Sequence, residues 1–130
     1  MTAPWEDFDC AAWTPADAEK ALRWVLRAMY DTQIQLAGHR DAELAAKHIF
    51  ERKKREAFFD EKCPTPARGV ATVADREAFV ERESAREREE YEIAQAYTAA
   101  ASEHLRTLRD QSMVIAALSK TVGQVVGAGR

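Results

Sequence analysis

The stretch ERKKREAFF, residues 51–59, gathers the side chains of this 130-residue chain that are most able to do chemistry. Four consecutive basic residues are followed by two adjacent phenylalanines, although the whole chain has a formal net charge of −3. From Lys47 to Glu56, five cations and two acids give a local net charge of +3. Cations beside aromatic rings are typical of single-strand nucleic-acid sites, because cations bind phosphates and rings stack on bases. The candidate contacts are Lys47, Arg52, Lys53, Lys54, Arg55, Phe58 and Phe59.

The same block also has a purely structural interpretation, as the end of a helix. Basic side chains there would complement the helix macrodipole and pair with acids of the segment that follows. Phe58 and Phe59 would then pack in the core. Successive residues turn by about 100° around a helix, so the four cations cannot all share one face. The sequence leaves both interpretations open.

Signatures of catalysis or of a bound metal are absent from the sequence. It contains no Gly-rich phosphate loop, no HExxH motif and no GxSxG motif. His39, His48 and His104 do not pair at helical spacing, and Cys10 and Cys63 match no spacing of metal ligands. We therefore expect a non-enzymatic protein that binds no metal and no cofactor.

The sequence also predicts a location. The N-terminus is acidic and has neither the basic segment nor the apolar segment of a secretory signal. No apolar run approaches the roughly 18 residues of a membrane span. We therefore expect no membrane contact, a cytoplasmic location, and two cysteines that remain free thiols.

Two long helices should carry these residues, and the first is predicted over residues 14–61. Thr14 is a good N-cap, Pro15 suits the first helical position, and Asp17 lies three residues after the cap. Gly38 costs the helix about 1 kcal/mol relative to alanine, so a kink or a frayed turn would fall there. Apolar or small residues at 3–4 spacing predict a coiled-coil-like seam. The seam residues are Leu22, Val25, Met29, Thr32 and Leu36, followed by Leu44, His48 and Ile49.

A loop is predicted over residues 62–71. Pro64 and Pro66 cannot continue a helix, and Gly69 adds conformational freedom. A loop of about ten residues suits a turn between two antiparallel helices.

The second helix is predicted over residues 72–122, with a flexible tail at residues 123–130. Thr72 and Asp75 resemble a capping box. Residues 75–92 carry eight acids and four arginines, a pattern typical of a solvated helix with local ion pairs.

A seven-residue repeat runs along this second helix. The segment MVIAAL, residues 113–118, is apolar on every side, so a single partner helix cannot bury it. We therefore predict an all-α fold in one helical domain, residues 1–130. Its core would be a long two-helix antiparallel hairpin, Thr14–Glu61 and Thr72–Val122, that oligomerises through its seams. The repeat comprises Ala94, Ala101, Leu108, Ile115 and Val122, with companions Thr98, Leu105, Ser112, Ser119 and Val126.

The N-terminal arm, residues 1–13, mixes Trp5, Phe8 and Trp13 with acidic residues. It is too short to be a domain. Its rings would either pin the arm onto the helices or serve as a hook for a partner.

This order of features resembles the small recombination mediator proteins of tailed phages, the UvsY type. In that family a K-x-R motif beside paired aromatics contributes to binding of single-stranded DNA; here Lys53, Lys54 and Arg55 precede the two phenylalanines. A later pattern, L-x-x-(I/L)-(K/R)-x-x-S-x-x-I, supports oligomer formation in that family. The resemblance covers roughly residues 40–120 and leaves out the N-terminal arm and the long acidic run. The later pattern reads here Leu105, Leu108, Arg109, Ser112 and Ile115.

The resemblance implies a mediator that binds single-stranded DNA, loosens single-strand-binding protein and helps a RecA-like recombinase nucleate its filament. For a phage-encoded protein this would take place in the host cytoplasm. Lys53 and Arg55 carry over as DNA contacts by motif position, and Arg52, Lys54 and Lys47 are added for their proximity. Members of the family form rings, so a ring-like homo-oligomer is implied. Its interface would comprise Leu105, Leu108, Ser112, Ile115, Leu118 and Val122.

A structural or adaptor protein is the competing hypothesis. A helical hairpin that oligomerises or docks another helix, as in phage morphogenesis, would need the cationic block only for solubility. A mediator should bind oligo-dT with an affinity that falls steeply with salt, because several phosphates are neutralised. An adaptor should bind it weakly or not at all, yet still assemble.

Overall fold

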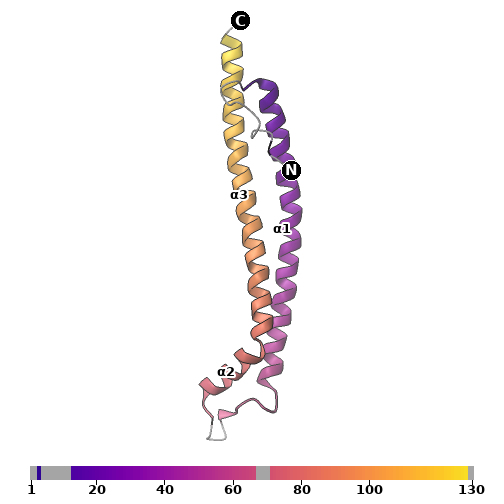
Figure 1. Cartoon of the computed structure of the whole chain (residues 1–130), viewed down its shortest axis with the longest axis vertical. Coiled ribbons are helices and arrows are strands. Elements are labelled where there is room, and N and C mark those ends of the chain that lie inside the picture. The colour runs from indigo at the N-terminus through magenta and orange to yellow at the C-terminus, as the bar shows by residue number, and fades with distance from the viewer. Residues whose placement is uncertain (1–2, 4–12, 67–70, 129–130) are drawn as a thin grey trace. The chain divides into compact units, whose positions relative to one another are not determined.

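The fold is all-α, as predicted. The computed structural model describes residue 3, residues 13–66 and residues 71–128, with side chains described as far as residue 121. Within that part of the chain there are three helices and no strand (Figure 1). They are α1, Pro15–Phe58; α2, Val73–Glu83; and α3, Ala85–Ala128. The predictions that concern Trp5, Phe8, Cys10 and Gly69 lie outside the described residues.

The start of α1 follows the predicted capping chemistry. The Thr14 backbone N–H donates to Asp17 Oδ2 at 3.0 Å, and the Asp17 N–H donates to Thr14 Oγ1 at 3.2 Å. The helix continues through Gly38, where an added Cβ would meet nothing within 4 Å. The backbone is helical there, so no frayed turn forms at this glycine. The helix ends at Phe58, three residues before the predicted Glu61.

The predicted second helix is in fact two helices, α2 and α3. The Thr72–Asp75 capping box that begins α2 is present as predicted. The break falls at Ser84, whose hydroxyl donates to the Val80 carbonyl at 2.7 Å. A serine hydroxyl can compete for backbone carbonyls in this way, so a helix can break where the sequence has neither glycine nor proline. α3 then continues past the predicted end at Val122, to Ala128.

The chain divides into two compact units. Residues 1–36 and 101–130 form one, called here the terminal unit, and residues 37–100 form the other, the central unit.

In the terminal unit, the first part of α1 packs against the last part of α3. Ala21, Val25 and Ile115 form a buried cluster. Leu105 and Leu108 are also buried. The predicted repeat on this part of α3 is therefore its buried face. Partly buried side chains pack against the cluster, namely Trp13, Leu22, Trp24 and Met29.

In the central unit, the seam on α1 differs from the prediction. Leu44 and Ile49 are 54% and 44% exposed, and His48 is exposed as well. The inward-facing positions of α1 recur with a seven-residue period along this part of the helix. Leu44, His48 and Ile49 do not fall on these positions, so they stay exposed. The buried or partly buried residues on this part of α1 are His39, Glu43, Ala46, Phe50, Glu51, Lys53 and Ala57, and all but Glu51 follow the seven-residue repeat.

Candidate nucleic-acid interface

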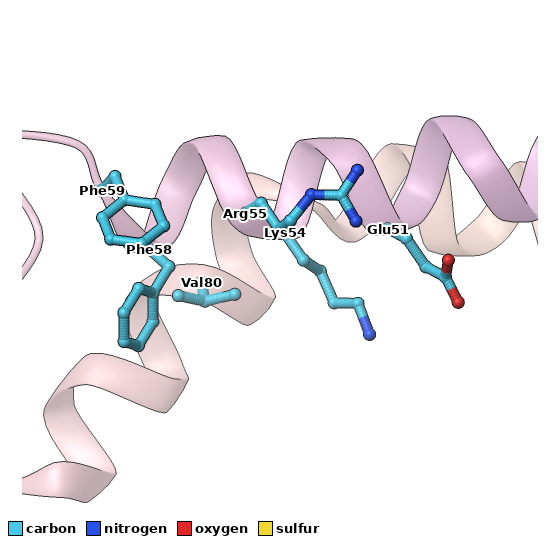
Figure 2. A pocket seen from close by; sticks show the side chains of 6 residues that line it. All are labelled: Glu51, Lys54, Arg55, Phe58, Phe59 and Val80. Atoms are coloured by element: carbon cyan, nitrogen blue, oxygen red, sulfur yellow. The ribbon is translucent and has the colours of Figure 1, made fainter.

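The cationic block and the two phenylalanines line an open groove in the central unit. The groove has a volume of about 420 Å³ and lies beside the last turns of α1 (Figure 2). Val80 of α2 contributes its far side. The residues along it are Glu51, Lys54, Arg55, Phe58, Phe59 and Val80. Four of the seven predicted DNA contacts therefore meet in one place.

Packing between the end of α1 and α2 positions the groove. Ala57, Cys63 and Phe79 form a buried cluster that joins the two helices through the intervening turn. Arg76 Nε, on the first turn of α2, donates to the Pro64 carbonyl at 3.2 Å. The guanidinium carbon of Arg76 also lies 4.3 Å from the centroid of the Phe58 ring.

The capping box fixes where α2 begins. The Thr72 N–H donates to Asp75 Oδ2 at 2.8 Å, and the Asp75 N–H donates to Thr72 Oγ1 at 3.2 Å. Hydrogen bonds from the Thr72 backbone and then from its side chain lower the pKa of Asp75 below its ordinary value of 3.8. The ionised carboxylate therefore stabilises the helix start that carries Arg76.

The two phenylalanine rings differ in their exposure. Phe58 is 41% exposed and Phe59 is 81% exposed. Their centroids are 5.1 Å apart with the planes at 83°, an edge-to-face contact. Core packing, the alternative that the sequence left open, does not describe Phe59.

The cations of the block have no acidic partner among the described residues. Lys47, Arg52, Lys54 and Arg55 are exposed, whereas Lys53 is partly buried. Within the described part of the chain, no carboxylate oxygen lies within 4.0 Å of any of the five. The ammonium of Lys54 instead lies 4.6 Å from the centroid of the Phe50 ring.

The acids that follow the loop make local ion pairs. Arg88 pairs with Glu81 at 2.7 Å, and Arg86 pairs with Glu90 at 3.3 Å. Arg86–Glu90 is an i,i+4 pair of the kind that the composition of residues 75–92 predicts, whereas Arg88–Glu81 spans seven residues across the break at Ser84. The cationic block therefore keeps its charge available for an anion.

Lys47, Arg52 and Lys53 do not line the groove. Lys53 lies on the inward side of α1, so of the two K-x-R residues only Arg55 reaches the groove. Sequence reasoning missed Arg76, because it treated the run around that residue as a solvated acidic face. The capping box placed Arg76 on a first helical turn, but only the packing of α2 against the end of α1 brings that turn to Phe58.

A second groove, of about 400 Å³, adjoins the first. It shares Lys54, Phe58 and Val80 with the first groove, and the charged residues that it adds are Arg76, Arg88, Glu77 and Glu81. The two grooves together carry four cations and three acids among apolar side chains, and one of the cations, Arg88, is paired with Glu81. The cations available to a phosphate are therefore concentrated at Lys54 and Arg55, next to the phenylalanine rings on which a base could stack.

Three of the six residues of the predicted oligomer interface are already buried in the terminal unit. Leu105, Leu108 and Ile115 face α1 of the same chain, and Ser112 is partly buried with its hydroxyl donating to the Arg109 carbonyl at 2.7 Å. Leu118 is exposed. The side chain of Val122 lies outside the described residues. The exposed apolar side chains of this part of α3 are Met113, Val114 and Leu118.

Neither a metal site nor a membrane span is found among the same residues. In the described part of the chain, no group of three or more His, Cys, Asp or Glu side chains is placed to hold a metal ion. None of the described helices is both long enough and apolar enough to cross a membrane.

Comparisons of the chain with protein-family models, with curated proteins and with solved structures found no match. The functional argument therefore depends on the motifs and on the geometry of the central unit.

Proposed function

We propose that the protein binds single-stranded DNA through the groove lined by Lys54, Arg55, Phe58 and Phe59. One observation carries the proposal: two cations without acidic partners among the described residues share a groove with a phenylalanine that is 81% exposed. Exposing such a ring to water is unfavourable unless a ligand covers it. A nucleotide would match both the cations and the exposed ring, because its phosphate would bind the cations and its base would stack on the ring.

The binding should be tolerant of sequence. Apart from its two cations, the polar side chain that lines the groove is Glu51, whose carboxylate can only accept hydrogen bonds. Phosphate contacts and stacking carry no information about base identity, whereas hydrogen bonds to base edges do. Arg52, Lys53 and Lys47 would add long-range attraction for the strand without lining the groove.

In the cell, we propose that the protein is a non-enzymatic recombination mediator of the UvsY type. It would help a RecA-like recombinase replace single-strand-binding protein on the strand. We also propose that α1 and α3 form one long antiparallel hairpin and that several copies assemble into a ring-like homo-oligomer. The exposed Met113, Val114 and Leu118 support assembly, because Val114 and Leu118 line an apolar groove of about 350 Å³ and Met113 adds exposed apolar surface one residue before Val114. A repeated patch would raise the avidity for a long strand by about 10²–10⁴-fold.

A structural or adaptor role is the second candidate, and one observation favours it. Leu26, Tyr30 and Ile34 are exposed at four-residue spacing on α1. An apolar stripe of this kind can dock another helix. In that role the protein would assemble or hold a partner, and the cationic block would only keep it soluble.

The test is fluorescence anisotropy of labelled oligo-dT at low and moderate salt. Wild type should bind with an affinity that falls steeply with salt. The Lys54→Ala/Arg55→Ala variant should bind about tenfold or more weakly, and the slope of log affinity against log salt should become shallower by about 0.7 for each phosphate that the variant no longer neutralises. The Lys53→Ala/Arg55→Ala variant should weaken binding less, because Lys53 is partly buried away from the groove.

The matched control is Lys20→Ala/Arg40→Ala. It removes the same charge from exposed positions outside the grooves of the central unit and should change affinity little. Light scattering should show the same assembly state for all variants. If wild type assembles but does not bind oligo-dT at low salt, the DNA-binding proposal is wrong and the adaptor role remains.

A further inference from the structure

The two adjacent phenylalanines cannot play the same part in the candidate site. This inference rests on the proposed single-strand binding and assigns separate roles within it. Stacking on a base requires a ring face that solvent can reach. The surroundings of Phe58 and Phe59 differ in this respect.

Phe58 is tied to α2. The guanidinium carbon of Arg76 lies 4.3 Å from the ring centroid, a cation–π contact that occupies one ring face. Arg76 is itself held by its hydrogen bond to the Pro64 carbonyl at 3.2 Å. Phe58 also lies beside Val80, which lines both grooves with it. The Phe58 ring is therefore already engaged by protein.

Among the described residues, Phe59 is held by its edge-to-face contact with Phe58 and by the helix backbone. Its N–H donates to the Arg55 carbonyl at 3.1 Å, so it continues the helical geometry by one residue. Arg55 and Phe59 are therefore neighbours at i and i+4 on the same side of α1. A phosphate held by Arg55 would bring the adjacent base to the Phe59 ring, which is 81% exposed.

We propose that Phe59 is the base-stacking residue of this site and that Phe58 is a positioning residue, which Arg76 holds against α2. The ligand is an unpaired nucleobase on a strand whose phosphates meet Lys54 and Arg55. A base inside a duplex is stacked on both faces and cannot cover this ring, so duplex DNA gains only the phosphate contacts.

The experiment compares oligo-dT with an abasic oligonucleotide of the same length, which keeps the phosphates and lacks the bases. Wild type should prefer oligo-dT by about tenfold, as expected for one stacked base. Phe59→Leu should abolish that preference and leave abasic binding unchanged. Lys54→Ala/Arg55→Ala should weaken binding to both ligands. Phe58→Leu should keep most of the preference, and Phe58→Tyr should keep all of it.

A spectroscopic readout separates direct stacking from positioning. Phe59→Trp should show tryptophan emission that oligo-dT quenches well beyond the change seen for wild type, and the abasic strand should not quench it. Phe58→Trp should show little added quenching. Circular dichroism should confirm that each variant keeps its helix content, which is expected for Phe59 because it is so exposed.

The outcomes distinguish the inference from the proposed function. If wild type binds neither strand, both fail. If wild type binds both strands equally and Lys54→Ala/Arg55→Ala binds neither, the phosphate site stands and the stacking role is overturned. If oligo-dT quenches Phe58→Trp and not Phe59→Trp, the roles of the two rings are reversed and the assignment is wrong.

Discussion

The terminal unit and the central unit both contain parts of α1 and α3, the central unit adds α2, and the two units leave different surfaces to solvent. The terminal unit buries Val25, Leu108 and Ile115 and exposes apolar side chains such as Met113. The central unit buries a cluster of Ala57, Cys63 and Phe79 and exposes cations beside aromatic rings. One helical architecture therefore presents a surface suited to protein contacts and another suited to a phosphate-bearing strand. The difference suggests that assembly and ligand binding can be changed separately.

The largest effect is expected in the core of the terminal unit. Leu108 is 1% exposed, so Leu108→Ala should lower the free energy of unfolding by about 2–5 kcal/mol, through reduced apolar burial and the cavity left behind. Urea denaturation followed by circular dichroism measures this change. The control, Met113→Ala, removes an exposed side chain and should change stability by less than about 0.5 kcal/mol. Equal losses of stability in the two variants would mean that Met113 is covered in the assembled protein.

The next effect concerns the exposed apolar surface of α3. Met113→Glu/Val114→Glu places charges where neighbouring copies would pack, so the assembly should dissociate while each chain stays helical. Light scattering measures the mass, and anisotropy measures binding to a long oligo-dT. Loss of avidity should weaken that binding by about 10²-fold, whereas a short oligo-dT should bind as before. An unchanged mass would show that copies do not assemble through this surface.

A smaller effect is expected from the acid in the groove. Glu51 lines it together with Lys54 and Arg55, and its negative charge opposes a phosphate. Glu51→Gln should therefore raise oligo-dT affinity about twofold, in line with the size of exposed charge interactions. Glu43→Gln, which lies outside both grooves, is the control. A weaker affinity in Glu51→Gln would mean that the carboxylate contacts the ligand directly.

The smallest effect concerns the start of α2 and its dependence on pH. Because the folded-state pKa of Asp75 is lowered, its capping contribution is present above its ordinary pKa of 3.8 and is lost as pH falls through the lower folded value. Asp75→Asn should be less stable than wild type at about pH 6, and the difference should shrink as pH falls below 3.8 and through the lower folded-state pKa of Asp75. Hydrogen exchange of the α2 amides measures this. A difference that persists at low pH would rule out the ionised carboxylate as its cause.

Several features followed from the sequence alone because they depend on short-range physics. The Thr14 and Thr72 caps involve residues three positions apart, so hydrogen bonding within one turn determines them. The repeat on α3 could be predicted for a similar reason, since Leu105, Leu108 and Ile115 recur at helical period and are buried. The cationic block beside two phenylalanines is also a local property of residues 51–59.

Only the tertiary structure decided which of these residues face one another. Leu44 and Ile49 look like seam residues, but the phase of α1 against its neighbours leaves them exposed. Arg76 lies 18 residues after Phe58 in the sequence, and the packing of α2 against the end of α1 brings it over that ring. Phe58 and Phe59 are the same residue type at adjacent positions, and their exposure differs because α2 covers part of the Phe58 ring. Helix period and capping are set by neighbours in sequence, whereas exposure and side-chain contacts are set by whichever segment packs alongside.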